Sequence, residues 1–89
     1  EIHTGKYCNL YQKGKKNIKE FMKIKKSATY AKSISLEVHA GHGLTYETAR
    51  QISKITEISE FNIGHFIVAE SIFIGLRKAI INFKKIINK

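Results

Sequence analysis

Hydrophobic positions along this chain follow a helical period in some stretches and form short runs in others. Between residues 14 and 34, apolar side chains recur mostly every three or four positions with lysines between them, which predicts an amphipathic helix. Thr45 is a suitable N-cap for another helix ending near Ile52, with Glu47 in its first turn. Short runs bounded by glycines predict strands. The predicted strands are residues 1–4, 36–39 and 60–63, and the last two predicted helices are 65–73 and 75–88, divided at Gly75.

The predicted elements therefore alternate between strand and helix. Strands alternating with helices of this length form a parallel sheet joined by right-handed crossovers, so the predicted fold class is α/β. A parallel sheet of three strands would leave its edges exposed, and the first residue already lies in a predicted strand. We therefore expect residues 1–89 to be the C-terminal segment of one larger α/β domain, without separate domains of its own.

The composition excludes some classes of protein. The single cysteine, Cys8, cannot form an internal disulfide, so a disulfide-stapled secreted scaffold is not expected. No stretch approaches the about 18 uninterrupted apolar residues that a membrane-spanning helix needs, and the first residues lack the pattern of a signal peptide. The expected protein is globular, with no membrane partner.

The formal charge of +9 is unevenly distributed along the chain. Residues 13–32 hold eight lysines against one glutamate, residues 77–89 hold five basic and no acidic residues, and residues 33–76 are mildly acidic. A helix this basic leaves a small nucleic-acid-binding module as an alternative function. Against that alternative, Phe21 and Tyr30 are the only aromatic residues in 13–32, which carry no recognised binding motif. We expect solvent-exposed helix faces and no nucleic-acid partner.

All four histidines are predicted to lie at or just beyond the C-terminal end of a strand, and glycines accompany them. Ligands bind at this end of the strands in open α/β sheets and in barrels, because the loops converge there. For two of the four, His3 and His39, a packed and hydrogen-bonded side chain remains an equal alternative. The group as a whole nevertheless predicts a ligand site at the strand ends.

The other two histidines have neighbours that favour a direct role. His42 lies between Gly41 and Gly43, which let a ligand approach the backbone closely, so an exposed, functional imidazole is favoured over a core side chain. His65 follows Gly64 at a predicted helix start, where backbone N–H groups attract phosphate. The alternative for His65 is a histidine that only begins a helix.

A metal site and a cysteine nucleophile are weaker hypotheses. His39 and His42 have the spacing of a zinc-ligand pair, but the chain contains no aspartate and no second cysteine. Glycines around His42 suit the approach of a ligand better than a fixed metal ligand. Cys8 has no obvious base near it in sequence. We therefore expect no metal and no covalent catalysis by Cys8.

Three motifs occur in order along the chain: E-I-H-T-G at residues 1–5, A-G-H-G-L at 40–44 and N-I-G-H at 62–65. Together they resemble the C-terminal third of the pyridoxine 5′-phosphate synthase family of vitamin B6 biosynthesis. The resemblance implies a TIM-type (β/α)8 barrel, of which this chain would hold strands six to eight, and a cytoplasmic homo-octamer. It implies condensation of 3-amino-2-oxopropyl phosphate with 1-deoxy-D-xylulose 5-phosphate to pyridoxine 5′-phosphate, phosphate and water, without metal or organic cofactor.

The same resemblance implies roles for individual residues. His42 corresponds to the proton donor of the family, and Glu1 to the glutamate that stabilises the transition state. Gly43, and Gly64 with His65, correspond to positions that bind the amino-oxopropyl phosphate substrate. The general bases of the family and its contacts to deoxyxylulose phosphate lie on earlier strands, so the segment alone is expected to be inactive.

Overall fold

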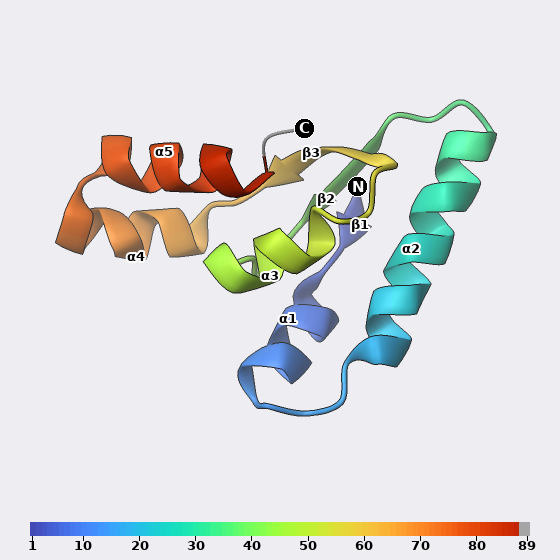
Figure 1. The fold of residues 1–89 in the computed structure, drawn as a ribbon, viewed down its shortest axis with the longest axis horizontal. Helices are drawn as coiled ribbons and strands as arrows, with labels where there is room; N and C mark the ends of the chain where they lie inside the picture. Colours follow the sequence, from blue (N-terminus) through green and yellow to red (C-terminus); the bar gives the residue numbers. More distant parts are fainter. Residues whose placement is uncertain (88–89) are drawn as a thin grey trace.

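The computed structural model describes residues 1–87 of the chain, and Figure 1 shows how its strands and helices are arranged. The predicted order of strands and helices is confirmed, with one additional helix near the start. The elements are β1 (Ile2–His3), α1 (Gly5–Gln12), α2 (Ile18–Ser33), β2 (Val38–Gly41), α3 (Tyr46–Ile52), β3 (Ile58–Asn62), α4 (His65–Ile74) and α5 (Leu76–Ile87).

The three strands form one parallel sheet in the order β1-β2-β3, so the α/β fold class is confirmed. His3 pairs with Gly41, which pairs in turn with Asn62 on the other side. A register irregularity between Val38 and His39 lets Ser59 fall outside the pairing. The carboxyl ends of all three strands therefore lie side by side at one edge of the sheet.

The boundaries of two strands differ from the prediction. β2 begins at Val38 instead of residue 36 because Ser35 adopts a positive φ of 67° after α2, and the exposed Leu36 lies in the connection. It continues through Ala40 to Gly41, whose small size allows close approach to both neighbouring strands. β3, in contrast, begins earlier than the predicted residue 60, at the fully buried Ile58.

Helix α1 was not predicted, and the helix expected over 14–34 begins later than expected. Gly14 has a φ of +68°, which interrupts the chain, and Asn17 precedes the first turn of α2. α1 buries Tyr7 and Cys8, and the half-buried Tyr11 follows Tyr7 by one helical turn. This short stripe was present in the sequence but is weaker than the lysine-spaced pattern after it.

Two predicted helix boundaries are confirmed by their local geometry. The Thr45 hydroxyl accepts a hydrogen bond from the backbone N–H of Thr48, whose own hydroxyl accepts from the N–H of Thr45, and Glu47 lies in the first turn. Gly75 divides α4 from α5 with a φ of 85°. The predicted end of the last helix, residue 88, lies outside the described residues.

The core lies on one face of the sheet. Side chains alternate between the two faces of a strand, and Val38, Ala40 and Ile58 join Ile24 and Ala28 of α2 in one buried cluster. Residues of α1 and α3 belong to the same cluster. The other face carries polar side chains and Gly41, so the helices of this core cover a single side of the parallel sheet (Figure 1).

Helices α4 and α5 form a hairpin that extends beyond the sheet (Figure 1). Tyr46 of α3 links it to the rest, with ring centroids 5.0 Å from Phe66 and 4.5 Å from Phe83. No residue of α4 is buried, and Ile72 and Phe73 are 79% and 83% exposed. No helix among the described residues is long and apolar enough to cross a membrane.

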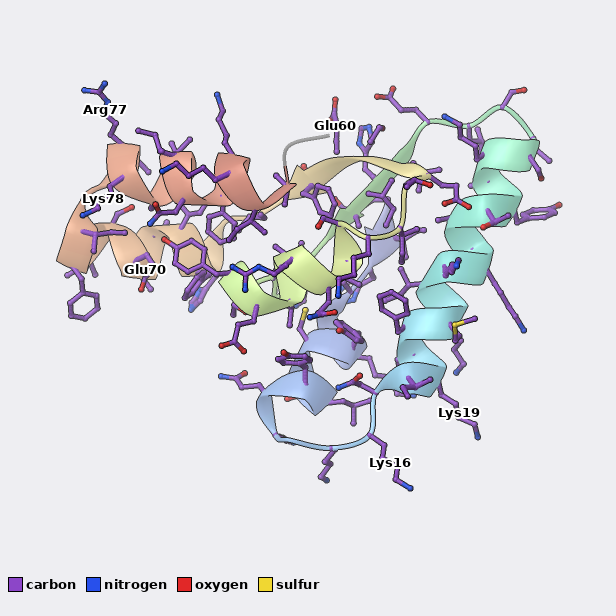
Figure 2. The ribbon with its side chains drawn as sticks, in the orientation of Figure 1. Lys16, Lys19, Glu60, Glu70, Arg77 and Lys78 are labelled. Carbon is purple, nitrogen blue, oxygen red and sulfur yellow. The ribbon has the colours of Figure 1, made fainter. Side chains whose placement is uncertain are left out.

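The basic residues lie on the outer surfaces of the helices. All eight lysines of residues 13–32 are exposed, and Figure 2 shows Lys16 and Lys19 pointing away from the sheet at the start of α2. Arg77 and Lys78 lie at the far end of the helical hairpin. These lysines, with Arg77 and Lys78, do not line the cavity at the strand ends.

Candidate functional site

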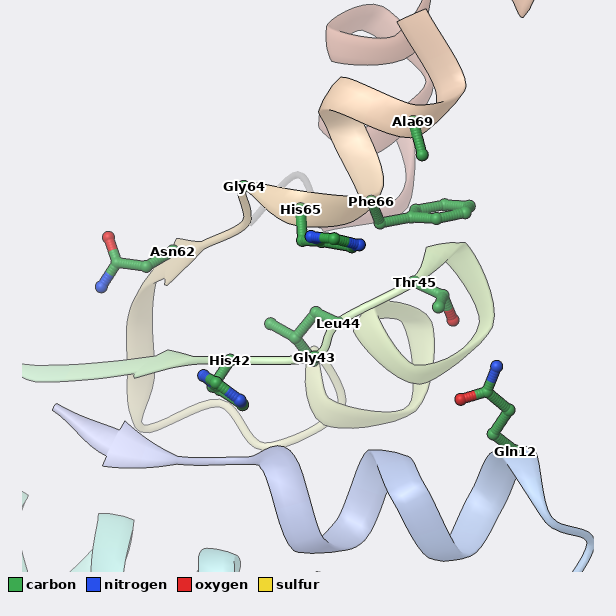
Figure 3. A pocket seen from close by; sticks show the side chains of 10 residues that line it. All are labelled: Gln12, His42, Gly43, Leu44, Thr45, Asn62, Gly64, His65, Phe66 and Ala69. Carbon is green, nitrogen blue, oxygen red and sulfur yellow. The ribbon is translucent and has the colours of Figure 1, made fainter. Parts of the chain in front are cut away.

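A cavity of about 520 Å³ lies at the carboxyl ends of β2 and β3. His42 and Gly43 line it from the loop after β2, and Gly64 and His65 line it from the start of α4 (Figure 3). Four of the five predicted site residues thus surround one space, although more than 20 positions separate the two pairs in sequence. A volume of this size falls within the range of small-molecule sites.

The backbone at His42 adopts a conformation that is unusual for a residue with a side chain. Its φ is +91°, and the contacts of its carbonyl oxygen show what holds it there. The buried Thr4 hydroxyl lies 2.7 Å from that oxygen and 2.9 Å from the carbonyl oxygen of Gly41, and its single proton is shared between the two. The Cys8 thiol also donates to the His42 oxygen, at 3.7 Å. The imidazole itself remains exposed.

Gly43 has to be a glycine for reasons of conformation and space. Its φ is +77°, a region that disfavours side chains, and a Cβ here would lie 3.3 Å from Cβ of Cys8. The loop after β2 therefore packs directly on α1. Burial raises the pKa of the Cys8 thiol, which favours the uncharged form and does not suit a nucleophile.

Glu1 lies at the same edge of the sheet, beside the cavity-lining Asn62. Asn62 Nδ2 donates a hydrogen bond to Glu1 Oε2, and the pair passes over Gly41. A Cβ at Gly41 would lie 2.9 Å from Cβ of Asn62 and 3.0 Å from the Glu1 carboxylate. Asn62 is not among the site residues predicted from sequence, although a polar residue at a strand end two positions before Gly64 is a usable signal.

The start of α4 has free backbone donors. Gly64 is its N-cap and provides no side-chain capping bond, and the first turn contains no acidic residue. A Cβ at Gly64 would meet nothing within 4 Å, so open space adjoins the helix start. Unpaired N–H groups and the helix dipole favour an anion at such a position. The exposed His65 imidazole lies next to the same space (Figure 3).

His39 does not lie at the end of its strand, contrary to the prediction. It is the second residue of β2, and its Nε2 atom lies 3.3 Å from a Glu37 oxygen and 3.4 Å from a Glu60 oxygen. One ligand atom from each of these three residues lies within 4.8 Å of the others, a group able to hold a cation. This group contains His39 but not His42, the other residue of the pair that the spacing suggested. None of its members lines the cavity.

A parallel α/β unit with glycine and histidine loops around a cavity at its strand ends has the arrangement with which α/β proteins bind small ligands at this edge. The comparison with protein families identifies a particular family among these proteins. A model described as "Pyridoxal phosphate biosynthesis protein PdxJ" matches residues 1–89, so the chain belongs to the PdxJ family.

Curated relatives support the same assignment. The chain is 53% identical over 89 residues to a pyridoxine 5'-phosphate synthase of Pelagibacter ubique, covering 100% of this chain and 37% of the relative. It is 54% identical over 87 residues to the enzyme of that name from Sulfurihydrogenibium sp., covering 98% of this chain and 35% of the relative. The chain therefore spans little more than a third of the length of these relatives.

Proposed function

We propose that this chain is the C-terminal third of a pyridoxine 5′-phosphate synthase. The proposed reaction condenses 3-amino-2-oxopropyl phosphate with 1-deoxy-D-xylulose 5-phosphate, giving pyridoxine 5′-phosphate, phosphate and water. The main support is the cavity at the strand ends, which brings His42, Gly43, Gly64 and His65 together. The names of the relatives and the family membership are consistent with this reaction.

The arrangement of the core supports a barrel as the complete fold. In a doubly wound sheet helices cover both faces, whereas in a (β/α)8 barrel they all lie outside and the inner face carries its own side chains. Here consecutive parallel strands have their helical core on one face and polar residues on the other. We propose that β1, β2 and β3 are strands six to eight of one barrel domain, assembled as a homo-octamer.

The roles that the family resemblance implies are each supported by a local property of the residue. Imine formation, dehydration and ring closure require proton transfers, and the exposed His42 imidazole at the cavity can give and take protons. Glu1, held by Asn62, would stabilise positive charge that develops in the transition state. Gly43, Gly64 and His65 would bind the amino-oxopropyl phosphate, its phosphate at the start of α4.

The proposed reaction uses no metal or organic cofactor at this site. The residues around the cavity supply proton transfer and anion binding, and the Glu37–His39–Glu60 group that could hold a cation does not line it. The general bases and the deoxyxylulose phosphate contacts would come from the preceding strands, so residues 1–89 alone should not turn over substrate.

The test replaces His42 by Asn in a full-length protein that contains this chain. Loss of a general acid typically costs about 10²–10⁴-fold in rate, so we expect kcat for pyridoxine 5′-phosphate formation to fall within that range. Far-UV circular dichroism and the unfolding midpoint should stay unchanged, because the side chain is exposed. Tyr30→Asn, a similarly exposed residue of α2, is the control. Near-normal turnover by His42→Asn would contradict the role given to His42.

The alternative of a nucleic-acid-binding module rests on the lysines of residues 13–32. These lysines are exposed on and before α2, and none of them lines the cavity. We propose that they form the solvent-facing side of an outer barrel helix. A gel-shift assay with DNA and RNA at low salt tests this, since phosphate contacts strengthen as salt falls. Retarded bands at low salt would favour the alternative.

A further inference from the structure

His3 is the one histidine beside the cavity that the proposed reaction leaves without a role. It is the last residue of β1, and its ring stacks on that of His42 with centroids 4.2 Å apart and an interplanar angle of 26°. We propose that His3 is a positioning residue, which holds the His42 imidazole in the orientation needed for proton transfer. This inference rests on the proposed function, because it gives His3 a task only if His42 moves a proton.

The backbone of the next turn holds one nitrogen of His3. Its Nδ1 accepts a hydrogen bond from the backbone N–H of Gly5 at 3.2 Å. This bond orients the His3 ring at the start of α1, where the ring also stacks on His42.

Gly5 provides an independent sign that the two rings pack as a unit. A Cβ at Gly5 would lie 2.6 Å from Cε1 of His3 and 2.7 Å from Cδ2 of His42. Both distances are shorter than carbon atoms can approach without displacement. The start of α1 therefore forms a surface against which both rings lie, and it accepts them only because this residue has no side chain.

The contacts of His42 divide between its backbone and its ring. Its carbonyl oxygen is held by Thr4 and Cys8, which fixes the loop but leaves rotation about the side-chain bonds free. The stack with His3 limits this rotation, together with the close approach of Gly5 to the His42 ring. The titratable groups that line hollows with His42 are His3, Lys6, Cys8 and His65.

The experiment uses the full-length protein and separates the effect of stacking by the His3 ring from the effect of its two nitrogens. His3→Ala removes the stack, and His3→Phe keeps a flat ring while removing both nitrogens. Misplacing a reacting group by about 1 Å can cost up to about 100-fold, and we expect His3→Ala to lower kcat about tenfold with little change in KM. His3→Phe should restore most of the lost kcat. Tyr30→Ala, which removes an exposed ring from α2, should have no effect.

A spectroscopic measurement gives a readout that does not depend on activity. The ring protons of His42, followed by NMR, should lose the ring-current shift in His3→Ala and retain one in His3→Phe. Gly5→Ala changes neither histidine, but its new methyl would displace both rings. It should therefore change the same resonances and lower kcat. If His3→Ala does not fold, Gly5→Ala and His3→Phe carry the test.

The outcomes separate this proposal from the proposed function. Wild-type kcat in His3→Ala would overturn the positioning role, as would an unchanged His42 ring resonance. A His3→Phe variant as slow as His3→Ala would also overturn it, because the nitrogens of His3 would then act directly. If the wild-type protein forms no pyridoxine 5′-phosphate, the proposed function fails instead; if His42→Asn is fully active, the role of His42 within that function fails, whatever the NMR shows about the stack.

Discussion

The two loops that line the cavity are held in very different ways. The loop after β2 is fastened by the Thr4 hydroxyl, the Cys8 thiol and the His3 ring, and it places His42 in a left-handed conformation. The start of α4 has no side-chain cap, and open space adjoins Gly64. The difference matches the two tasks proposed for these loops. A proton donor needs a fixed direction, whereas an anion site needs backbone N–H groups that remain unoccupied.

The largest effect on stability is expected from Gly43→Ala in the fastened loop. A left-handed conformation costs a residue with a side chain about 1–2 kcal/mol, and the new methyl would press on Cβ of Cys8, 3.3 Å away. We expect the free energy of unfolding of the full-length protein to fall by about 2 kcal/mol in urea titrations, and kcat to fall with it. A variant of unchanged stability would show that this loop is looser than its contacts indicate.

A smaller effect is expected from Thr4→Val, which keeps the shape of the side chain but removes its hydroxyl. The His42 carbonyl then retains only the long contact from Cys8, while Gly41 keeps the backbone bond from the Thr4 N–H at 2.8 Å. Loss of one buried hydrogen bond costs about 1 kcal/mol. The unfolding free energy should fall by about this amount, and Thr4→Ser, which keeps the hydroxyl, is the matched control for the hydrogen bond.

The smallest effect on stability is expected from Gly64→Ala at the open junction. A methyl meets no atom within 4 Å, so stability should change by only about 0.5 kcal/mol, the difference between two N-cap residues without a capping bond. The methyl would instead enter the space proposed for the phosphate. We expect KM for the amino-oxopropyl phosphate to rise about tenfold, which is about 1.4 kcal/mol of binding, with kcat little changed. A large loss of stability here would erase the contrast between the loops.

The parts of the fold that depend on local patterns were predictable from sequence. The Thr45 cap, the break at Gly75 and the parallel α/β order all follow from short-range signals and are confirmed. α1 was missed because it begins at Gly5 without a capping side chain and carries a short apolar stripe. The two-residue shift of β2 followed from the turn at Ser35, which no periodicity records.

The candidate site likewise has features that were predictable from local sequence and features that were not. Glycines beside His42 and His65 pointed to loops that accept ligands, and the structure brings these loops to one cavity. The stacking of His3 on His42 depends on the pairing of His3 with Gly41, so it could not be read from residues that lie far apart in sequence. His39 was misplaced because β2 continues past the predicted end of the strand to Gly41.

Helix α4 has a practical consequence for anyone preparing this chain by itself. Most of its side chains are apolar and they are not confined to one face, and Val68, Ile72 and Phe73 are 67%, 79% and 83% exposed. Contiguous apolar surface of this kind promotes self-association in water. At high concentration, preparations of residues 1–89 should therefore scatter light and elute early from a size-exclusion column. Dilution or a mild detergent would decide whether the monomer or the self-associated form is studied.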